Sequence, residues 1–237
     1  MKPSSLTLGY APGTTPAKWA RIWAERHPEV PLHLRAVSAA DAAGEVRAGR
    51  VDVALLRLPA DTSGLAVIPL YEETTVAVLP TDHLLSATDE LTPADLEGEP
   101  ILLPLDDVVG WSEAPGLPVE HRPENTLAAI ELVAAGLGIL IVPQSLARLH
   151  HRKDLGYRPI GGAPTCAVAL AFPDGPQSTL VAEFIGVVRG RKPGSSRGQV
   201  QPAPKRTARE KALAKQAARA AAGKTARKPG RSGRGRT

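Results

Sequence analysis

The stretch VAAGLGILIVPQS, Val133 to Ser145, runs from alanines through two glycines into aliphatic residues and then reaches a proline. A Gly-x-Gly holds a phosphate when it follows a strand and begins a helix. Gly136 and Gly138 instead follow an alanine-rich helical pattern and precede a strand-like run, so they lie at the negative end of a helix dipole. The order predicts that the glycines end a helix and begin a strand, and it argues against a phosphate loop.

The chain before this stretch alternates short apolar runs with amphipathic segments. The first five predicted elements run strand, helix, strand, helix, strand, and they span residues 5–11, 14–28, 30–37, 39–49 and 51–58. This alternation is typical of a parallel sheet covered by helices. The strands are apolar along most of their length, which favours a sheet that is buried on both faces.

After Leu70 the spacing of the elements changes. Thr92 followed by Pro93 is typical of the first residues of a helix, which is predicted over residues 91–98. Further strands are predicted at residues 74–80, 99–104, 138–143, 155–160 and 165–172, and further helices at 125–136, 143–151 and 179–190. Residues 1–190 are therefore predicted to form an α/β body.

Charge divides the chain into two parts. From Arg189 to the C-terminus there are 16 Lys and Arg residues and one acid, Glu210, which gives a local charge of +15. The preceding 188 residues carry 13 basic and 23 acidic residues, a charge of −10. Residues 191–237 have no apolar core pattern, so they are predicted to form a disordered, basic, low-complexity tail.

Six segments of the body occur together in a familiar order: LTLGYAPGTT, ERHPEVPLHL, AGRVDVALLRLP, LAVIPLYEETTVAVLPTDHLL, LTPADLEGEPILL and LVAAGLGILIVPQSL. They resemble the effector-binding (substrate-binding) domain of LysR-type transcriptional regulators over about residues 5–188. The resemblance implies an α/β, two-lobed, type 2 periplasmic-binding-protein fold. It places lobe I at about residues 1–70 and 163–190, lobe II at about 73–158, and two crossover hinge strands near 68–74 and 157–165.

The resemblance also implies that a small effector, expected to be an anionic metabolite, binds in the cleft between the lobes. Gly13, Thr14 and Thr15 join the first strand to the first helix, where backbone N–H groups and two hydroxyls suit a carboxylate. The threonines alternatively cap the helix. Ser38 follows the second strand and is a candidate N-cap with the same geometry. Arg57 ends the third strand and either pairs with an anionic effector or forms a salt bridge with an acid of the body.

On the lobe II side, Asn125 and Thr126 begin a predicted helix whose N-terminus faces the cleft. Leu103 and Pro104 lie in a loop that is expected to supply backbone contacts to the ligand. Family members usually carry another helix between this loop and Asn125. The corresponding segment here, DDVVGWSEAPGLPVEHRPE, is rich in Pro and Gly, so that helix is predicted to be shortened or lost.

Other chemistry is not favoured by the sequence. No nucleophile, base and orienting residue occur at a recognisable spacing, so we expect no enzymatic activity and no cofactor. His150 and His151 point in different directions on a helix, which argues against a metal site. The single Cys166 lies in an apolar run, so it is expected to be a buried core residue of a cytoplasmic protein. No apolar run is long enough to cross a membrane.

The basic tail has its own predicted role. Cations on a flexible segment bind polyanions with steep salt dependence and little sequence preference. Non-specific affinity for nucleic acid is therefore predicted for the tail, through Lys205, Arg206, Arg209, Lys211, Lys215, Arg219, Lys224, Arg227 and Lys228. The alternative is an inert, solubilising tail.

Three functions fit these patterns. The first is a small-molecule sensing module for transcription regulation whose tail binds DNA. The second is a stand-alone small-molecule binding protein. The third is a dimerisation partner, either of itself or of complete LysR-type regulators, because effector domains of that family pair. The chain begins almost directly on the first predicted strand, so the helix-turn-helix of a complete regulator is not expected in it.

Overall fold

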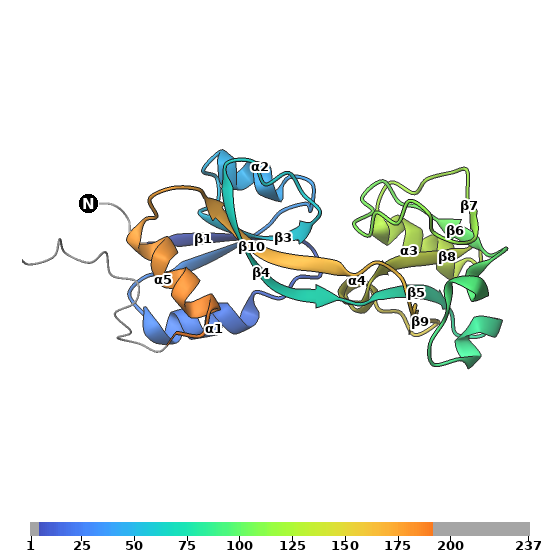
Figure 1. Ribbon diagram of the computed structural model, residues 1–237. Helices are drawn as coiled ribbons and strands as arrows, with labels where there is room; N and C mark the ends of the chain where they lie inside the picture. Colours follow the sequence, from blue (N-terminus) through green and yellow to red (C-terminus); the bar gives the residue numbers. More distant parts are fainter. Residues whose placement is uncertain (1–4, 192–237) are drawn as a thin grey trace, which may run out of the picture. The chain divides into compact units, whose positions relative to one another are not determined.

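A computed structural model of the protein describes residues 5–191. The predicted nucleic-acid-binding residues, from Lys205 to Lys228, lie outside the described residues. The described part contains two five-stranded sheets, with strand orders β2-β1-β3-β10-β4 and β7-β6-β8-β5-β9 (Figure 1).

The first sheet combines parallel and antiparallel pairs. Its strands are β1 (Leu6–Tyr10), β2 (Leu32–Ala36), β3 (Val53–Leu58), β4 (Leu65–Glu73) and β10 (Cys166–Pro173). β1 pairs in parallel with β2 and with β3, whereas β10 lies antiparallel between β3 and β4. The helices packed on this sheet are α1 (Ala17–Arg26), α2 (Ala42–Arg47) and α5 (Thr179–Val188).

The core of this sheet follows the alternation of side chains along each strand. On β3, Val53 and Leu55 pack with Trp23 of α1 and with α5, while Ala54 and Leu56 pack with α2 on the opposite face. All four strand residues are fully buried. The predicted burial of both faces is therefore confirmed for β3, because helices cover both of its faces. It is wrong for β2, which lies at the edge of the sheet and has four exposed residues out of five.

The second sheet is built in the same way. Its strands are β5 (Thr75–Pro80), β6 (Pro100–Leu102), β7 (Leu117–Pro118), β8 (Ile139–Pro143) and β9 (Leu155–Pro159). The helices α3 (Thr126–Ala134) and α4 (Gln144–Leu149) pack on one face. The other face is covered by the short 3-10 helices η1 (Leu84–Ala87) and η2 (Pro93–Leu96) and by the loop that contains Trp111.

The helix predicted at residues 91–98 is the single 3-10 turn η2. Its start is nevertheless where the sequence placed it, because Thr92 and Asp95 form a capping box and Pro93 occupies the first turn. Between Leu103 and Asn125 the described chain contains only the short strand β7, so the predicted loss of a helix in this segment is confirmed. Trp111 is half-buried and packs against the core of the second sheet.

The glycine turn after α3 ends the helix as predicted. The N–H of Gly136 donates to the carbonyl of Val133, and the N–H of Leu137 donates to that of Leu132. This pair of bonds is a Schellman motif, which requires a left-handed residue, and Gly136 has φ +73°. The turn therefore satisfies helix carbonyls, which is the role predicted for it.

Gly138 and β8 complete the stretch. A Cβ on Gly138 would lie 2.6 Å from the carbonyl oxygen of Pro100, so only glycine allows β6 to approach here. The following residues alternate between the two faces of the sheet, with Ile139 and Ile141 in one core and Leu140 and Val142 in the other. The run ILIV is thus a central strand buried on both faces.

The chain passes between the two sheets twice, once from β4 to β5 and once from β9 to β10 (Figure 1). These passages match the two predicted crossover strands. One hydrogen bond joins the two passages, from the hydroxyl of Thr75 to the carbonyl of Pro164.

Candidate functional site

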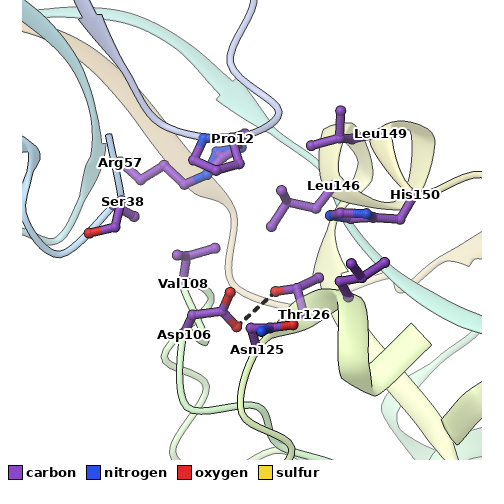
Figure 2. A pocket seen from close by; sticks show the side chains of 12 residues that line it. Pro12, Ser38, Arg57, Asp106, Val108, Asn125, Thr126, Leu146, Leu149 and His150 are labelled. Carbon is purple, nitrogen blue, oxygen red and sulfur yellow. Dashed lines mark hydrogen bonds between the residues drawn. The ribbon is translucent and has the colours of Figure 1, made fainter. Parts of the chain in front are cut away.

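A pocket of about 340 Å³ lies where loops from the two sheets meet (Figure 2). This volume lies within the range of small-molecule sites, which is about 300–1,000 Å³. The pocket is lined by Pro12, Ser38, Ala39, Arg57, Asp106, Val108, Asn125, Thr126, Leu127, Leu146, Leu149 and His150.

The first wall comes from the carboxyl ends of the three parallel strands. Pro12 follows β1, Ser38 and Ala39 follow β2, and Arg57 lies near the end of β3. Because these strands run in the same direction, their carboxyl ends share one edge of the sheet. Chain segments that are far apart in the sequence therefore supply one surface.

The second wall comes from the loop after β6 and from the start of α3. Asp106 and Val108 belong to that loop, and Asn125, Thr126 and Leu127 form the helix start. The carboxylate of Asp106 accepts a 2.9 Å hydrogen bond from the hydroxyl of Thr126, which is buried (Figure 2). This bond fixes the loop to the helix.

Asn125 caps α3, which begins at Thr126 and therefore close to the predicted start. Its Oδ1 accepts a 2.9 Å hydrogen bond from the N–H of Ala128. Because that oxygen faces the helix, the amide nitrogen of Asn125 is the group left for the pocket.

The third wall is one face of α4. Leu146, Leu149 and His150 recur at helical spacing of three and four residues, so they share a face. Most of the pocket surface is apolar, since the two leucines join Pro12 and Val108.

Arg57 reaches the pocket, but its guanidinium is already bound by the protein. Nη1 donates to Oε2 of Glu73 at 2.7 Å, and the two side chains are 2% and 8% exposed. Nη2 donates to the carbonyl of Pro12 at 2.9 Å and to Oγ of Ser145 at 3.0 Å. Of the two interpretations of Arg57, the structure contains the salt bridge.

Ser38 lines the pocket but does not cap the following helix. α2 begins at Ala42 after Asp41, three residues later than the N-cap assignment required. The hydroxyl of Ser38 accepts from the N–H of Asp41 at 3.0 Å and donates to its carboxylate at 2.7 Å. The predicted cap is therefore wrong, because Ser38 closes a turn ahead of the helix instead.

The loop with Gly13, Thr14 and Thr15 lies beside the pocket rather than in its lining. The buried hydroxyl of Thr14 donates to the carbonyl of Ala11 at 2.6 Å. α1 begins at Ala17 without a side-chain cap, so the capping alternative for the threonines is wrong. A Cβ on Gly13 would lie 2.8 Å from Oγ of Ser145 and 2.8 Å from Nη2 of Arg57, so this loop packs directly against the start of α4.

Leu103 and Pro104 also lie outside the lining. Their carbonyl oxygens accept hydrogen bonds of 3.0 Å and 2.8 Å from Arg122. The same loop contributes to the pocket two residues further on, through Asp106. A role for any of the predicted site residues in ligand binding remains a prediction.

The lining residues outside the predicted loops are mostly apolar: Ala39, Val108, Leu127, Leu146 and Leu149, together with His150. Pro12 and Asp106 lie in the two predicted loops but were not singled out as site residues. The helical spacing of Leu146, Leu149 and His150 was a usable signal for one face of α4. The spacing alone does not predict which part of the fold this face of the helix contacts.

The lone cysteine is a buried residue behind the loop that contains Val108. Cys166 is 1% exposed, and its Sγ donates to the carbonyl of Val108 at 3.1 Å. Burial raises the pKa of this thiol to about 11, which keeps it protonated.

Within residues 5–191 there is no group of three or more His, Cys, Asp or Glu side chains that could hold a metal ion. In the same part of the chain, no helix has the length and apolar character needed to cross a bilayer.

Comparison with known proteins agrees with the resemblance found in the sequence. The chain matches the family model of the LysR substrate binding domain over residues 5–192. It is 27% identical to the Hca operon transcriptional activator HcaR of Escherichia coli (strain K12), over 78% of this chain and 67% of that protein. It is 30% identical to the HTH-type transcriptional regulator CatR of Pseudomonas putida, over 64% of this chain and 56% of that protein. The chain spans about half to two thirds of the length of these curated relatives.

Solved structures have the same fold. The BenM effector binding domain with its effector benzoate superimposes with a TM-score of 0.66 at 19% identity, over 78% of this chain and 90% of that chain. The reduced form of OxyR gives a TM-score of 0.65 at 21% identity, over 80% of this chain and 96% of that chain. The α/β fold with two mixed five-stranded sheets is therefore that of these effector-binding domains.

Proposed function

Because the chain belongs to the family of LysR substrate binding domains, we propose that it binds a small-molecule effector in the pocket between its two sheets and acts as the sensing part of a transcription regulator. The family is non-enzymatic. The observation that carries the proposal is the pocket itself, whose walls come from both sheets and which is mostly apolar with a few convergent polar groups.

The position of the pocket supports a sensing role. Ser38 and Ala39 line it from the first sheet, while Asn125 and Thr126 line it from the second. A ligand that contacts both walls binds best when they are at one particular separation, so it shifts the population of lobe arrangements towards that separation. The two crossover passages beside Thr75 are the segments that would absorb the movement.

A pair of neighbouring variants tests the proposal. Ala39 lines the pocket, whereas the next residue, Ala40, is exposed and does not. We expect Ala39→Phe to fill part of the pocket and abolish the thermal shift caused by small-molecule hits from a screen of the full chain. Ala40→Phe should preserve that shift, which for a ligand at 100 times its Kd corresponds to about 2.7 kcal/mol. Hits that survive Ala39→Phe unchanged would place ligand binding elsewhere and contradict the proposal.

The basic C-terminal part supports a second, separate activity. The 16 basic residues from Arg189 onwards, beside one acid, favour non-specific binding to nucleic acid through release of counterions. The affinity of the full chain for duplex DNA should fall steeply between about 50 and 200 mM salt. Truncation before Arg189 should remove this affinity, and DNA binding that is unaltered by the truncation would reject the tail as its source.

A further inference from the structure

We infer that the ligand of this pocket is an uncharged molecule with a hydrogen-bond donor, such as an amide on a small apolar body, and is not a carboxylate. The inference rests on the proposed function, since it names the class of ligand for the same pocket. It follows from the charges of the wall, because the guanidinium of Arg57 and the N-terminus of α3 each already face a carboxylate of the chain itself.

The first such group is the guanidinium of Arg57. Its charge is matched by Glu73 at 2.7 Å, and both N–H groups of Nη2 already have acceptors in Pro12 and Ser145. An incoming carboxylate would have to compete with these partners in a place where the Arg57 side chain is only 2% exposed. Arg57 therefore fixes the wall and is not free to bind an anion.

The second such group is the N-terminus of α3, where the helix dipole favours negative charge. Asp106 already places a negative charge beside this end of the helix, because its carboxylate accepts a hydrogen bond from the hydroxyl of Thr126 in the first turn. Asp106 itself is exposed, and a second anion beside it would be repelled. Taking Arg57 with Glu73 as a neutral pair, the wall has a net charge of −1 from Asp106.

The polar groups still open to a ligand define what it must offer. Asp106 accepts hydrogen bonds, and the amide nitrogen of Asn125 donates them. The side chains of Asp106 and Asn125 lie at the same corner of the pocket (Figure 2). They are held there because Thr126, which follows Asn125 in the chain, is hydrogen-bonded to Asp106. The hydroxyl of Ser38 is occupied by Asp41. A carboxamide fits this corner, since its N–H donates to Asp106 and its oxygen accepts from Asn125.

The rest of the lining sets the body of the ligand. Pro12, Val108, Leu146 and Leu149 offer apolar contact on the other sides. A pocket of about 340 Å³ accommodates a single ring with a short substituent. Benzamide and benzoate are therefore matched probes, because they share the ring and differ only in the group presented to Asp106.

Calorimetric titration of the full chain at about pH 8 tests the inference. We expect benzamide to bind at least about tenfold more tightly than benzoate, which corresponds to about 1.4 kcal/mol. In Asp106→Asn the side chain keeps its acceptor for Thr126 but loses its charge, so the ratio of the two affinities should fall by about tenfold or more. Asp107→Asn removes the same charge one residue away and should leave the ratio unchanged.

Three outcomes would overturn the inference: tighter binding of benzoate by the wild type, an unchanged ratio in Asp106→Asn, or an equal change in Asp107→Asn. If neither ring compound binds but another hit is lost in Ala39→Phe and kept in Ala40→Phe, the ligand class is wrong and the proposed function stands. If no hit is lost in Ala39→Phe, the proposed function fails as well.

Discussion

The buried ion pair between Arg57 and Glu73 makes a prediction about stability that the structure allows to be worked out. Glu73→Gln removes the negative charge and leaves the guanidinium, with a side chain 2% exposed, without a counter-charge. Removal of one partner from a buried pair costs about 3–5 kcal/mol. Glutamine retains an oxygen that accepts from Arg57, so we expect the lower end, about 3 kcal/mol. For a body of this size, the melting temperature should fall by roughly 6–12 °C.

Removal of the positive charge of the pair should lower the free energy of unfolding more than removal of the negative charge. Arg57→Met leaves the carboxylate of Glu73 unpaired and also removes the donors to Pro12 and Ser145. We expect a loss of about 5 kcal/mol, at the upper end of the range for a broken buried pair. The double variant Arg57→Met/Glu73→Gln contains no unpaired charge, so its loss should be only about 2–3 kcal/mol, which reflects the missing hydrogen bonds at about 1 kcal/mol each and the buried amide.

Urea unfolding of the full chain, followed by tryptophan fluorescence, measures all three variants, since Trp23 lies in the core of the first sheet. Arg21 and Glu25 supply a matched control, because this pair is 3.7 Å apart with side chains 73% and 62% exposed. Glu25→Gln should change the free energy of unfolding by less than about 0.5 kcal/mol. If Glu73→Gln costs no more than this control, or if the single and double variants are additive, the buried pair does not exist in solution.

Three further predictions concern other features of the fold. Cys166 should resist alkylation in the native protein at about pH 8 and react on unfolding, because burial raises the pKa of its thiol to about 11; rapid reaction of the native protein with a thiol reagent would contradict this. Asn125→Ala should lower the free energy of unfolding by about 1 kcal/mol through loss of the α3 cap, and an unchanged urea midpoint would argue against that cap. Gly138→Ala should cost more than Gly44→Ala, because a Cβ meets the carbonyl of Pro100 at 2.6 Å in the first case and nothing within 4 Å in the second; equal midpoints would refute the close approach.

The strands and helices could be predicted because their signals are local. The apolar run ILIV, the glycines before it and the start of a helix at Asn125 and Thr126 each depend on neighbouring residues. The element at residues 91–98 was predicted with the correct start, but it is a single 3-10 turn. The capping box sets where a helix begins, and it does not determine how far the helix continues.

The candidate site was harder to predict, because its contacts are long-range. Arg57 and Glu73 meet across β10, whose Val168 pairs with Arg57 on one side and with Tyr71 on the other. No pattern near Arg57 indicates that a strand from the end of the body is inserted between β3 and β4. The partner of Arg57, and with it the expected charge of the ligand, depends on this insertion.

The N-cap assignment of Ser38 failed for a different reason. A hydroxyl after a strand and before a helical pattern fits a cap equally well at any position of a short connecting turn. Here Asp41 provides both the acceptor and the donor for Ser38, so the turn closes before α2 begins. The helical pattern gave the existence of α2 but not its first residue.

Resonance shifts of backbone amides on ligand addition test whether the ligand binds between the two sheets, because they report both walls of the pocket at once. The full chain, labelled with ¹⁵N, would be titrated with the tightest-binding molecule of the screen. We expect the largest shifts on Ala39 of the first wall and on Val108 and Thr126 of the second, with the amide of Ala94 in the remote turn η2 unchanged. Shifts confined to one of the two walls, or centred away from these residues, would show that the pocket is not where the ligand binds.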